Sequence, residues 1–178
     1  NSVQLQLERF KVFSKKFLIA YNENESVVYA VKRKEGGIHK VSLDPKHKNP
    51  LIEEFIKLPK INSRGSLFVL DMSFDNNDIY VSFVGENSKI DECNYFYLYA
   101  YNLRNENWKQ LFKSTPCIPK LPFHDIGGKI SFNANSIFVS GGNIFTIHKT
   151  EEFIKNYKDL MEKTNIYGSV VEIDKKSL

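Results

Sequence analysis

Hydrophobic and polar positions alternate over short runs along most of the chain, which is typical of β-strands rather than of helices. The clearest run predicts a β-hairpin with strands at 129–132 and 137–140. His124 stands just before this hairpin, and Asn143 stands just after it. Because an antiparallel pair returns the chain to its starting level, we expect His124 and Asn143 to come close in space.

The same alternation predicts further strands and one exception. Residues 51–58 alternate imperfectly and fit either a strand or one helical turn. Thr150 can cap a helix that ends near Lys163, because the apolar positions between them recur every three or four residues. We expect the first hairpin to pair 10–13 with 17–21. The other strands are expected at 27–32, 37–43, 67–74, 79–84, 95–101, 108–113 and 167–173.

Short strands at hairpin spacing, without alternating helices, predict an all-β fold. Grouped in fours, the strands fall at 10–43, 51–101 and 108–147, with one strand beyond. Units of ~40–50 residues suit the blades of a β-propeller. We therefore expect residues 1–178 to form a single domain, a partial propeller of about three to four blades with one short helix near 150–163. An open stack leaves strand edges exposed, so we expect closure by self-association or by a missing C-terminal half.

Composition narrows the class of protein. The chain has 178 residues, of which 42% are hydrophobic and 26% are charged, and this balance indicates a globular rather than a disordered protein. The net charge of +4 is scattered, and the densest basic run is only residues 32–34, so we expect no nucleic-acid partner. No apolar stretch is long enough to span a bilayer. No signal peptide is visible at Asn1, which leaves a removed leader, an absent leader and a start within a gene open.

Two cysteines flank a predicted hairpin. Cys93 and Cys117 are each twelve residues from its centre near Asn105, so the strand ladder would leave them near each other. A disulfide in an oxidising compartment and two unrelated small hydrophobic residues are both consistent with this spacing. The spacing does not suggest a metal site.

Several other polar and aromatic groups are open to two interpretations. The tyrosines of residues 95–101 fall on one face of a strand, where sheet packing is expected and a sugar-stacking surface is the alternative. The acidic and amide residues of 75–78 fit a turn better than a Ca²⁺ site. His39, His47 and His148 are interpreted as surface residues.

Seven stretches are similar, in order, to motifs of one known family. Two of them are residues 28–39, which resemble an early hairpin with a basic-Gly turn, and residues 96–101, which resemble the strand after a long loop. Residues 124–132 (H-D-I-G-G-K-I-S-F) and 137–143 (I-F-V-S-G-G-N) resemble H-x-G-G-R-hydrophobic-x-F and Y-V-(S/T)-x-G-D. Residues 65–74 and 79–83 resemble a G-L-L-G-hydrophobic-A-F segment and the Y-V-S-Y strand behind it. Residues 167–174 resemble a G-K-(I/V)-L-R-I-D strand. On these stretches the chain resembles the N-terminal half of the glucose/sorbosone dehydrogenase family, six-bladed propellers that bind pyrroloquinoline quinone.

The resemblance implies a reaction and a set of site residues. The reaction is oxidation of a sugar hydroxyl or aldose by hydride transfer to the quinone. His124 would be the general base, which suits a group with a pKa near neutrality. Asn143 stands where the family has the supporting aspartate, and Asp125 is a substitute for it. Gly128 and Lys129 occupy the glycine and arginine positions of the motif and are the candidate cofactor-binding residues.

The chain also departs from the family pattern. One extra residue separates His124 from the glycine pair, Asn143 lacks the carboxylate charge, and Lys129 lacks the bidentate fork of arginine. The alternative function is therefore a non-catalytic propeller module for binding or structural interaction. The family implies a periplasmic or extracellular location, a small sugar as substrate, and pyrroloquinoline quinone as cofactor, with Ca²⁺ as a further candidate.

Overall fold

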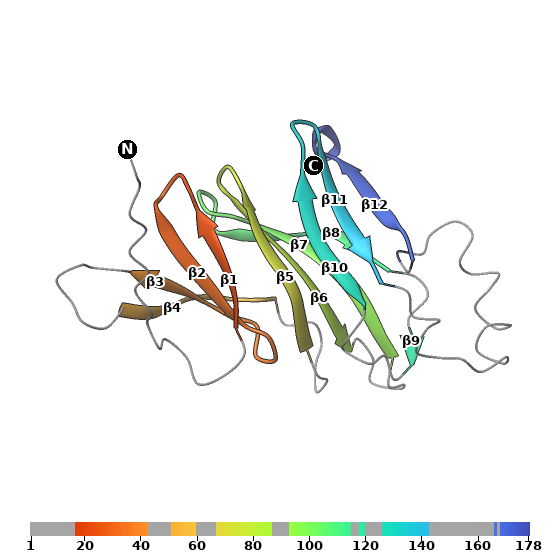
Figure 1. Ribbon diagram of the computed structural model, residues 1–178, viewed down its shortest axis with the longest axis horizontal. Coiled ribbons are helices and arrows are strands. Elements are labelled where there is room, and N and C mark those ends of the chain that lie inside the picture. Colours follow the sequence, from red (N-terminus) through yellow and green to blue (C-terminus); the bar gives the residue numbers. More distant parts are fainter. Residues whose placement is uncertain are drawn as a thin grey trace, which may run out of the picture.

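The computed structural model describes residues 17–42, 51–59, 67–86, 93–114, 118–119, 126–142, 166 and 168–178. These residues are almost entirely β-structure, so the predicted all-β class is confirmed for them (Figure 1). The elements are β1 (Phe17–Asn22), β2 (Val27–Lys32), β3 (Gly37–Ser42), β4 (Leu51–Lys57), β5 (Leu67–Asp75), β6 (Asp78–Glu86), β7 (Cys93–Asn102), β8 (Asn107–Lys113), β9 (Ile118–Pro119), β10 (Gly127–Phe132), β11 (Ser136–Gly141), β12 (Val170–Asp174) and the 3₁₀ helix η3 (Lys175–Ser177).

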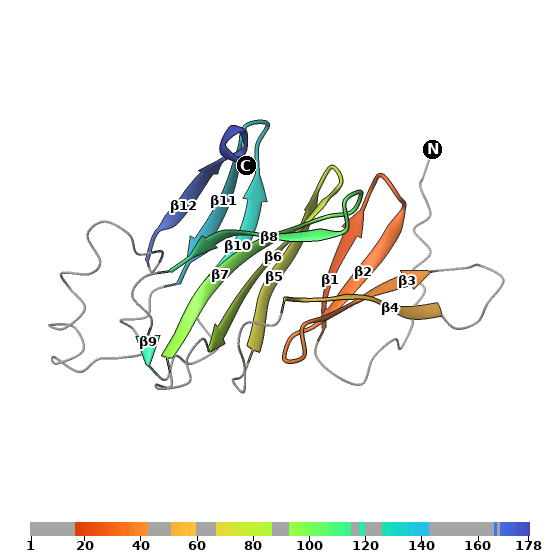
Figure 2. The same cartoon turned by 180° about the vertical axis from the view of Figure 1, so that it is seen from behind.

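The strands form three antiparallel sheets in which successive strands are neighbours. The first sheet has the order β1-β2-β3-β4, the second has β5-β6-β7-β8, and the third has β10-β11-β12. The short strand β9 pairs with β7 at the margin of the second sheet. The first strands of the three sheets lie side by side, with β5 between β1 and β10 (Figures 1 and 2). The second sheet is therefore the middle layer of the described structure.

The grouping of strands into units differs from the sequence-based expectation. Residues 51–58 were expected to open the second unit, but β4 pairs with β3 and is the outer strand of the first sheet. In the same way β8 closes the second sheet instead of opening the third. The expected grouping at 10–43, 51–101 and 108–147 is therefore wrong, because it places β4 and β8 each one sheet too late. Alternation shows where strands lie and not which strands share a sheet. The expected strand at 10–13 lies outside the described residues.

Two hydrophobic clusters hold the three layers together. Val31 and Ile38 of the first sheet pack against Phe83 and Tyr97 of the second. On the other side of the second sheet, a separate cluster joins Phe96 and Leu98 of β7 to Ile130 and Val139 of the third sheet. The second sheet is thus buried on both faces, because neighbouring residues of β7 point to opposite sides. This explains why its strands read as nearly continuous hydrophobic runs.

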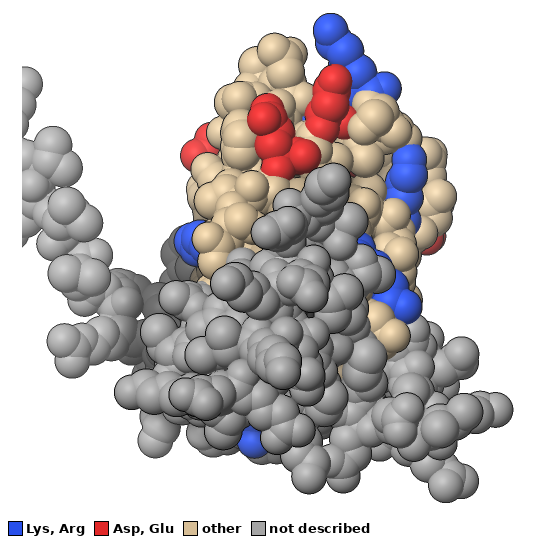
Figure 3. All heavy atoms as spheres, turned by 90° about the vertical axis from the view of Figure 1, so that its right-hand side faces the viewer, with Lys and Arg blue, Asp and Glu red and all other residues tan. Residues whose placement is uncertain are grey.

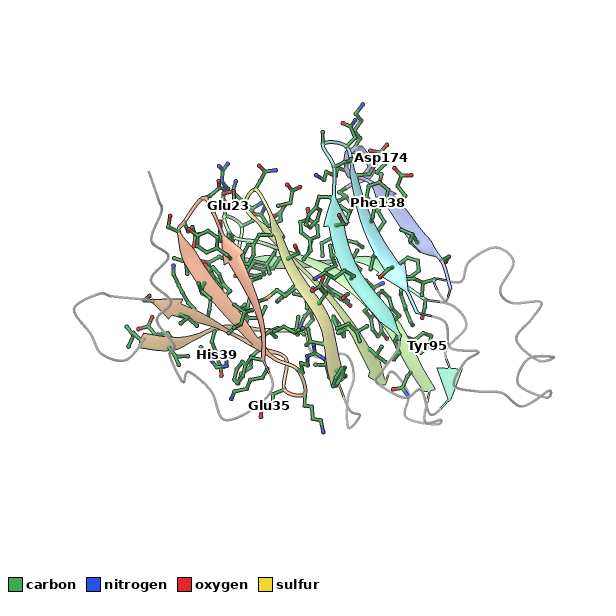
Figure 4. All side chains as sticks on the ribbon, viewed as in Figure 1. Glu23, Glu35, His39, Tyr95, Phe138 and Asp174 are labelled. Carbon is green, nitrogen blue, oxygen red and sulfur yellow. The ribbon has the colours of Figure 1, made fainter. Side chains whose placement is uncertain are left out.

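Packing also settles two interpretations made from the sequence. The tyrosines of β7 belong to the cluster between the first and second sheets, and the ring of Tyr97 stacks on Phe83 with centroids 5.3 Å apart. Sheet packing is therefore confirmed as their role. The interpretation of His39 as a surface residue is wrong, because only 8% of it is exposed. Its ring meets the edge of Phe17 near the lower end of the first sheet (Figure 4).

Candidate functional site

The β10–β11 hairpin that carries the predicted site is formed as expected. Ile130 pairs with Val139 in an antiparallel register, and Ser131 pairs with Phe138. The turn is held by Asn133, whose Oδ1 accepts hydrogen bonds from the backbone N–H groups of the second and third residues after it, at 2.8 and 2.6 Å. An asparagine that bonds its own downstream backbone is a standard turn device, and it fixes the register of the hairpin.

At the open end of the hairpin the two strands return to the same level. The backbone N–H of Gly142 donates to the carbonyl of Ile126 at 2.5 Å. The predicted catalytic residues His124 and Asp125 directly precede this point, and Asn143 directly follows it. All three lie outside the described residues, so the meeting of their side chains stays a prediction. The backbone closure on which that prediction depends is present.

Gly128, a predicted cofactor-binding residue, lies at a close contact between β10 and β5. Its φ is +90°, and a Cβ at this position would lie 2.5 Å from the Cβ of Leu70. Its carbonyl oxygen accepts a hydrogen bond from the Ser82 hydroxyl at 2.5 Å. The requirement for glycine therefore comes from the packing of the second and third sheets.

Lys129, the second predicted cofactor-binding residue, lies beside a carboxylate of β5. Its Nζ is 3.2 Å from Oδ1 of Asp71, and its side chain is 79% exposed while that of Asp71 is 10% exposed. The other carboxylate oxygen, Oδ2, accepts the backbone N–H of Ile130 at 2.8 Å. One buried carboxylate thus bonds two successive residues of β10. Sequence reasoning missed Asp71, although a lone acidic residue within an apolar strand was an available signal.

These contacts test whether Gly128 and Lys129 fit a bound quinone. Pyrroloquinoline quinone carries three carboxylates and needs cations around it. Of these two residues only Lys129 is a cation, and it is already within ion-pair distance of Asp71. The space beside Gly128 is filled by the side chain of Leu70. Both residues are explained by the junction between β5 and β10, and their cofactor-binding role stays a prediction.

The remaining sequence-based expectations fall partly outside the described residues. Cys93 begins β7, and its backbone pairs with Pro119 of β9, but Cys117 is not among the described residues, so the disulfide stays a prediction. The helix expected near 150–163 also lies outside them. In the described part of the chain, no group of three His, Cys, Asp or Glu residues could hold a metal ion. No described helix is long and apolar enough to cross a membrane.

A second polar feature lies at the opposite end of the sheets, where the β1–β2 and β5–β6 turns enclose a hollow of about 340 Å³. The Asn24 side-chain amide donates to the backbone carbonyl of Asn76 at 3.0 Å and joins the two turns. Asp75 is held by Lys175 of η3, with 2.6 Å between Nζ and Oδ2. The hollow is lined by Tyr21, Asn22, Glu23, Asn24, Phe74, Asp75 and Asn76.

No protein-family model, no curated protein and no solved structure gives a significant match to this chain. The fold and the two features described above therefore carry the functional argument by themselves.

Proposed function

We propose that the three sheets are consecutive blades of a β-propeller. Three features support this arrangement. Each sheet is an antiparallel meander, the first strands β1, β5 and β10 are neighbours, and the middle sheet is buried on both faces. In a propeller the first strand of each blade lines a central axis and the later strands lie progressively further out.

We propose further that the open end of the β10–β11 hairpin is an acid–base site of the sugar-dehydrogenase type. In this proposal His124 takes the proton of a sugar hydroxyl while the carbon loses hydride, and Asn143 or Asp125 orients the imidazole. The single observation that supports it is the closure of the hairpin between Ile126 and Gly142, which returns the chain to the level of the predicted base. By the family resemblance the hydride acceptor is pyrroloquinoline quinone, and no described residue is assigned to its binding.

The decisive experiment combines quinone titration with dye-linked oxidation of an aldose. We expect binding at micromolar pyrroloquinoline quinone, followed by aldose-dependent reduction of the dye. His124→Gln should lower the rate by about 10²–10⁴-fold, the usual contribution of a general base. His148→Gln, the same change elsewhere in the chain, is the matched control and should leave the rate unchanged. Absence of quinone binding in the folded wild-type protein would eliminate the enzyme proposal.

The second candidate function is a non-catalytic binding module with the same architecture. The observation in its favour is the ion pair between Lys129 and Asp71, which gives the lysine of the resembling motif a partner without any cofactor. A protein that folds normally, binds no quinone and still binds a sugar would support this second function.

Propeller closure requires a partner for the first sheet. Ile19 and Tyr21 are 68% and 53% exposed, and they alternate along β1 with residues that pack on the second sheet. The exposed face of β12 in the third sheet carries Val170 together with Glu172 and Asp174, and acidic atoms gather at the upper end of that side (Figure 3). We propose that further β-structure, from a second copy or from a C-terminal half, covers the apolar face of the first sheet. A light-scattering mass of one chain would contradict closure by a second copy, and Ile19→Lys should abolish any dimer.

A further inference from the structure

The opening hairpin of each sheet carries an aromatic side chain at the same two positions. One aromatic residue is on the first strand, directly before the turn, and these residues are Tyr21, Phe74 and Phe132. The other is on the second strand, opposite the residue that precedes the first, and these residues are Tyr29, Tyr80 and Phe138. Because successive positions of a strand point to opposite faces, the two aromatic residues of each hairpin lie on opposite faces of their sheet.

Within the chain these aromatic residues make the same contact at both junctions between sheets. Phe74 of the second sheet meets Tyr29 of the first, with ring centroids 5.0 Å apart. Phe132 of the third sheet meets Tyr80 of the second, also with centroids 5.0 Å apart. Each junction therefore joins the first-strand aromatic residue of one sheet to the second-strand aromatic residue of the sheet that precedes it in the chain.

The first sheet presents one half of this contact to solvent. Met72 and Ile130 stand two residues before the first-strand aromatic residues of the second and third sheets, and they are 4% and 5% exposed. Ile19 has the same position in the first sheet and is 68% exposed, and Tyr21 is 53% exposed. The face that the other two sheets bury against a preceding sheet is thus uncovered on β1.

The third sheet presents the other half. Tyr29 and Tyr80 are 1% and 4% exposed, whereas Phe138 in the equivalent position is only half-buried. Phe138 points away from the second sheet, because its neighbours Ile137 and Val139 pack in the cluster between the second and third sheets. The first and third sheets are at opposite ends of the stack, and Figure 4 shows Phe138 at the end away from the first sheet. The chain therefore carries one unmatched half of the junction at each end.

We propose that a second copy of this chain supplies both missing halves, so that Tyr21 of each copy packs on Phe138 of the other. The inference rests on the propeller arrangement of the proposed function and not on its quinone chemistry. Two copies of three sheets give a closed propeller of six sheets, within the usual range of about four to eight blades, which three sheets alone do not reach. The two faces that meet are different, so closure requires the contact to form twice about a twofold axis.

The charged residue beside Phe138 is compatible with this contact. Glu172 of β12 pairs with Phe138 of β11 and is exposed. Lys40 stands in the same place beside Tyr29, on the third strand of the first sheet, and its Nζ is 3.6 Å from a carboxylate oxygen of Glu25. A charged third strand is therefore already present at a junction that forms within the chain.

The test measures molecular mass by light scattering for the wild-type full chain and for two variants of opposite charge, Tyr21→Lys and Phe138→Glu. We expect two chains per particle for the wild type at micromolar concentration. Each variant alone should weaken association about 30-fold or more, the usual effect of losing a central aromatic residue of an interface, and should appear as one chain. Trp108 fluorescence checks that each variant is folded. Ile19→Lys and Val170→Glu repeat the pair on the same two faces should either variant fail to fold.

Leu51→Lys is the matched control for a lysine introduced at an exposed apolar position of the first sheet. Leu51 is 60% exposed. The register from Tyr21 through β2 and β3 leads to Ile52, so Leu51 points to the other face of the sheet. This variant should keep the mass of two chains.

Mixing Tyr21→Lys with Phe138→Glu tests the direction of the contact. A mixed particle has one contact between native Tyr21 and Phe138 and one between the introduced lysine and glutamate. The mixture should therefore return to two chains. An association of first sheet with first sheet would instead be insensitive to Phe138→Glu and would gain nothing from the mixture.

Three outcomes would overturn the proposal. They are a wild-type mass of one chain, a two-chain mass for folded Phe138→Glu, and folded variants that do not associate when mixed. Quinone binding by the wild type is a separate measurement. A two-chain protein that binds no quinone would refute the enzyme proposal alone, and a one-chain protein that binds quinone would refute this one alone.

Discussion

Replacement of Asp71 tests the junction between the second and third sheets most directly. The carboxylate is 10% exposed and bonds the backbone N–H of Ile130 at 2.8 Å and Nζ of Lys129 at 3.2 Å. Asp71→Ala removes both bonds, and it leaves the N–H group of a residue that is only 5% exposed without an acceptor. A hydrogen bond to a charged group contributes about 1.5–3 kcal/mol, and an unpaired buried donor costs about 1–3 kcal/mol. These two figures describe the same loss, so we expect a destabilisation of about 2–3 kcal/mol.

The partner of Asp71 provides an internal control. The Lys129 side chain is 79% exposed, and an exposed ion pair contributes only about 0–1 kcal/mol. Lys129→Ala should therefore lower the free energy of unfolding by less than about 1 kcal/mol, since Ile130 keeps its acceptor. Asp71→Asn should fall between the two alanine variants, because its amide oxygen can still accept from Ile130 while the charge is lost.

Urea denaturation followed by the fluorescence of Trp108 measures all three variants. The urea concentration at the midpoint should be highest for Lys129→Ala, lower for Asp71→Asn and lowest for Asp71→Ala. The slope of the free energy of unfolding against urea concentration should stay unchanged. Equal losses in Lys129→Ala and Asp71→Ala would refute the reasoning, because the stabilisation would then come from the ion pair and not from the buried backbone bond. Normal stability of Asp71→Ala would refute the geometry itself.

Three further outcomes follow from the packing. Gly128→Ala should destabilise the protein more than Gly168→Ala, measured by thermal unfolding, because both have positive φ but only the first meets another side chain, Leu70. Phe83→Ala should cost about 3–5 kcal/mol in urea denaturation, because the ring is fully buried. Burial lowers the pKa of His39 below its ordinary value, so its protonation is unfavourable in the folded state. Stability should therefore decline as pH falls below about 6.5, and His39→Gln should remove that part of the pH dependence.

The sequence predicted most of the described strands but not their grouping into sheets. The hairpin at β10–β11 was predicted from alternation, because that signal is local. The membership of β4 in the first sheet was not predicted, since pairing between β3 and β4 depends on contacts that alternation does not encode. The burial of His39 was missed for a related reason, because the packing of an aromatic ring from β1 against it is visible only once the sheet has formed.

The candidate site was predictable only in the part that depends on residues close together in the sequence. The return of the chain at Ile126 and Gly142 follows from hairpin geometry and was predicted. The ion pair of Lys129 with Asp71 joins residues 58 positions apart, so a motif limited to residues 124–132 could not contain it.

The contacts of β10 explain part of its sequence motif by packing. Gly128 must be glycine because Leu70 approaches it, and Lys129 is placed where it can pair with Asp71. Both requirements come from packing the third sheet on the second, and they would persist in a propeller without any enzymatic activity. The Gly-Gly-Lys part of the motif is therefore explained by packing and is not by itself an argument for an enzymatic reaction. The enzyme proposal depends on His124, Asp125 and Asn143, at the two ends of the hairpin, which is why the histidine variant is its decisive test.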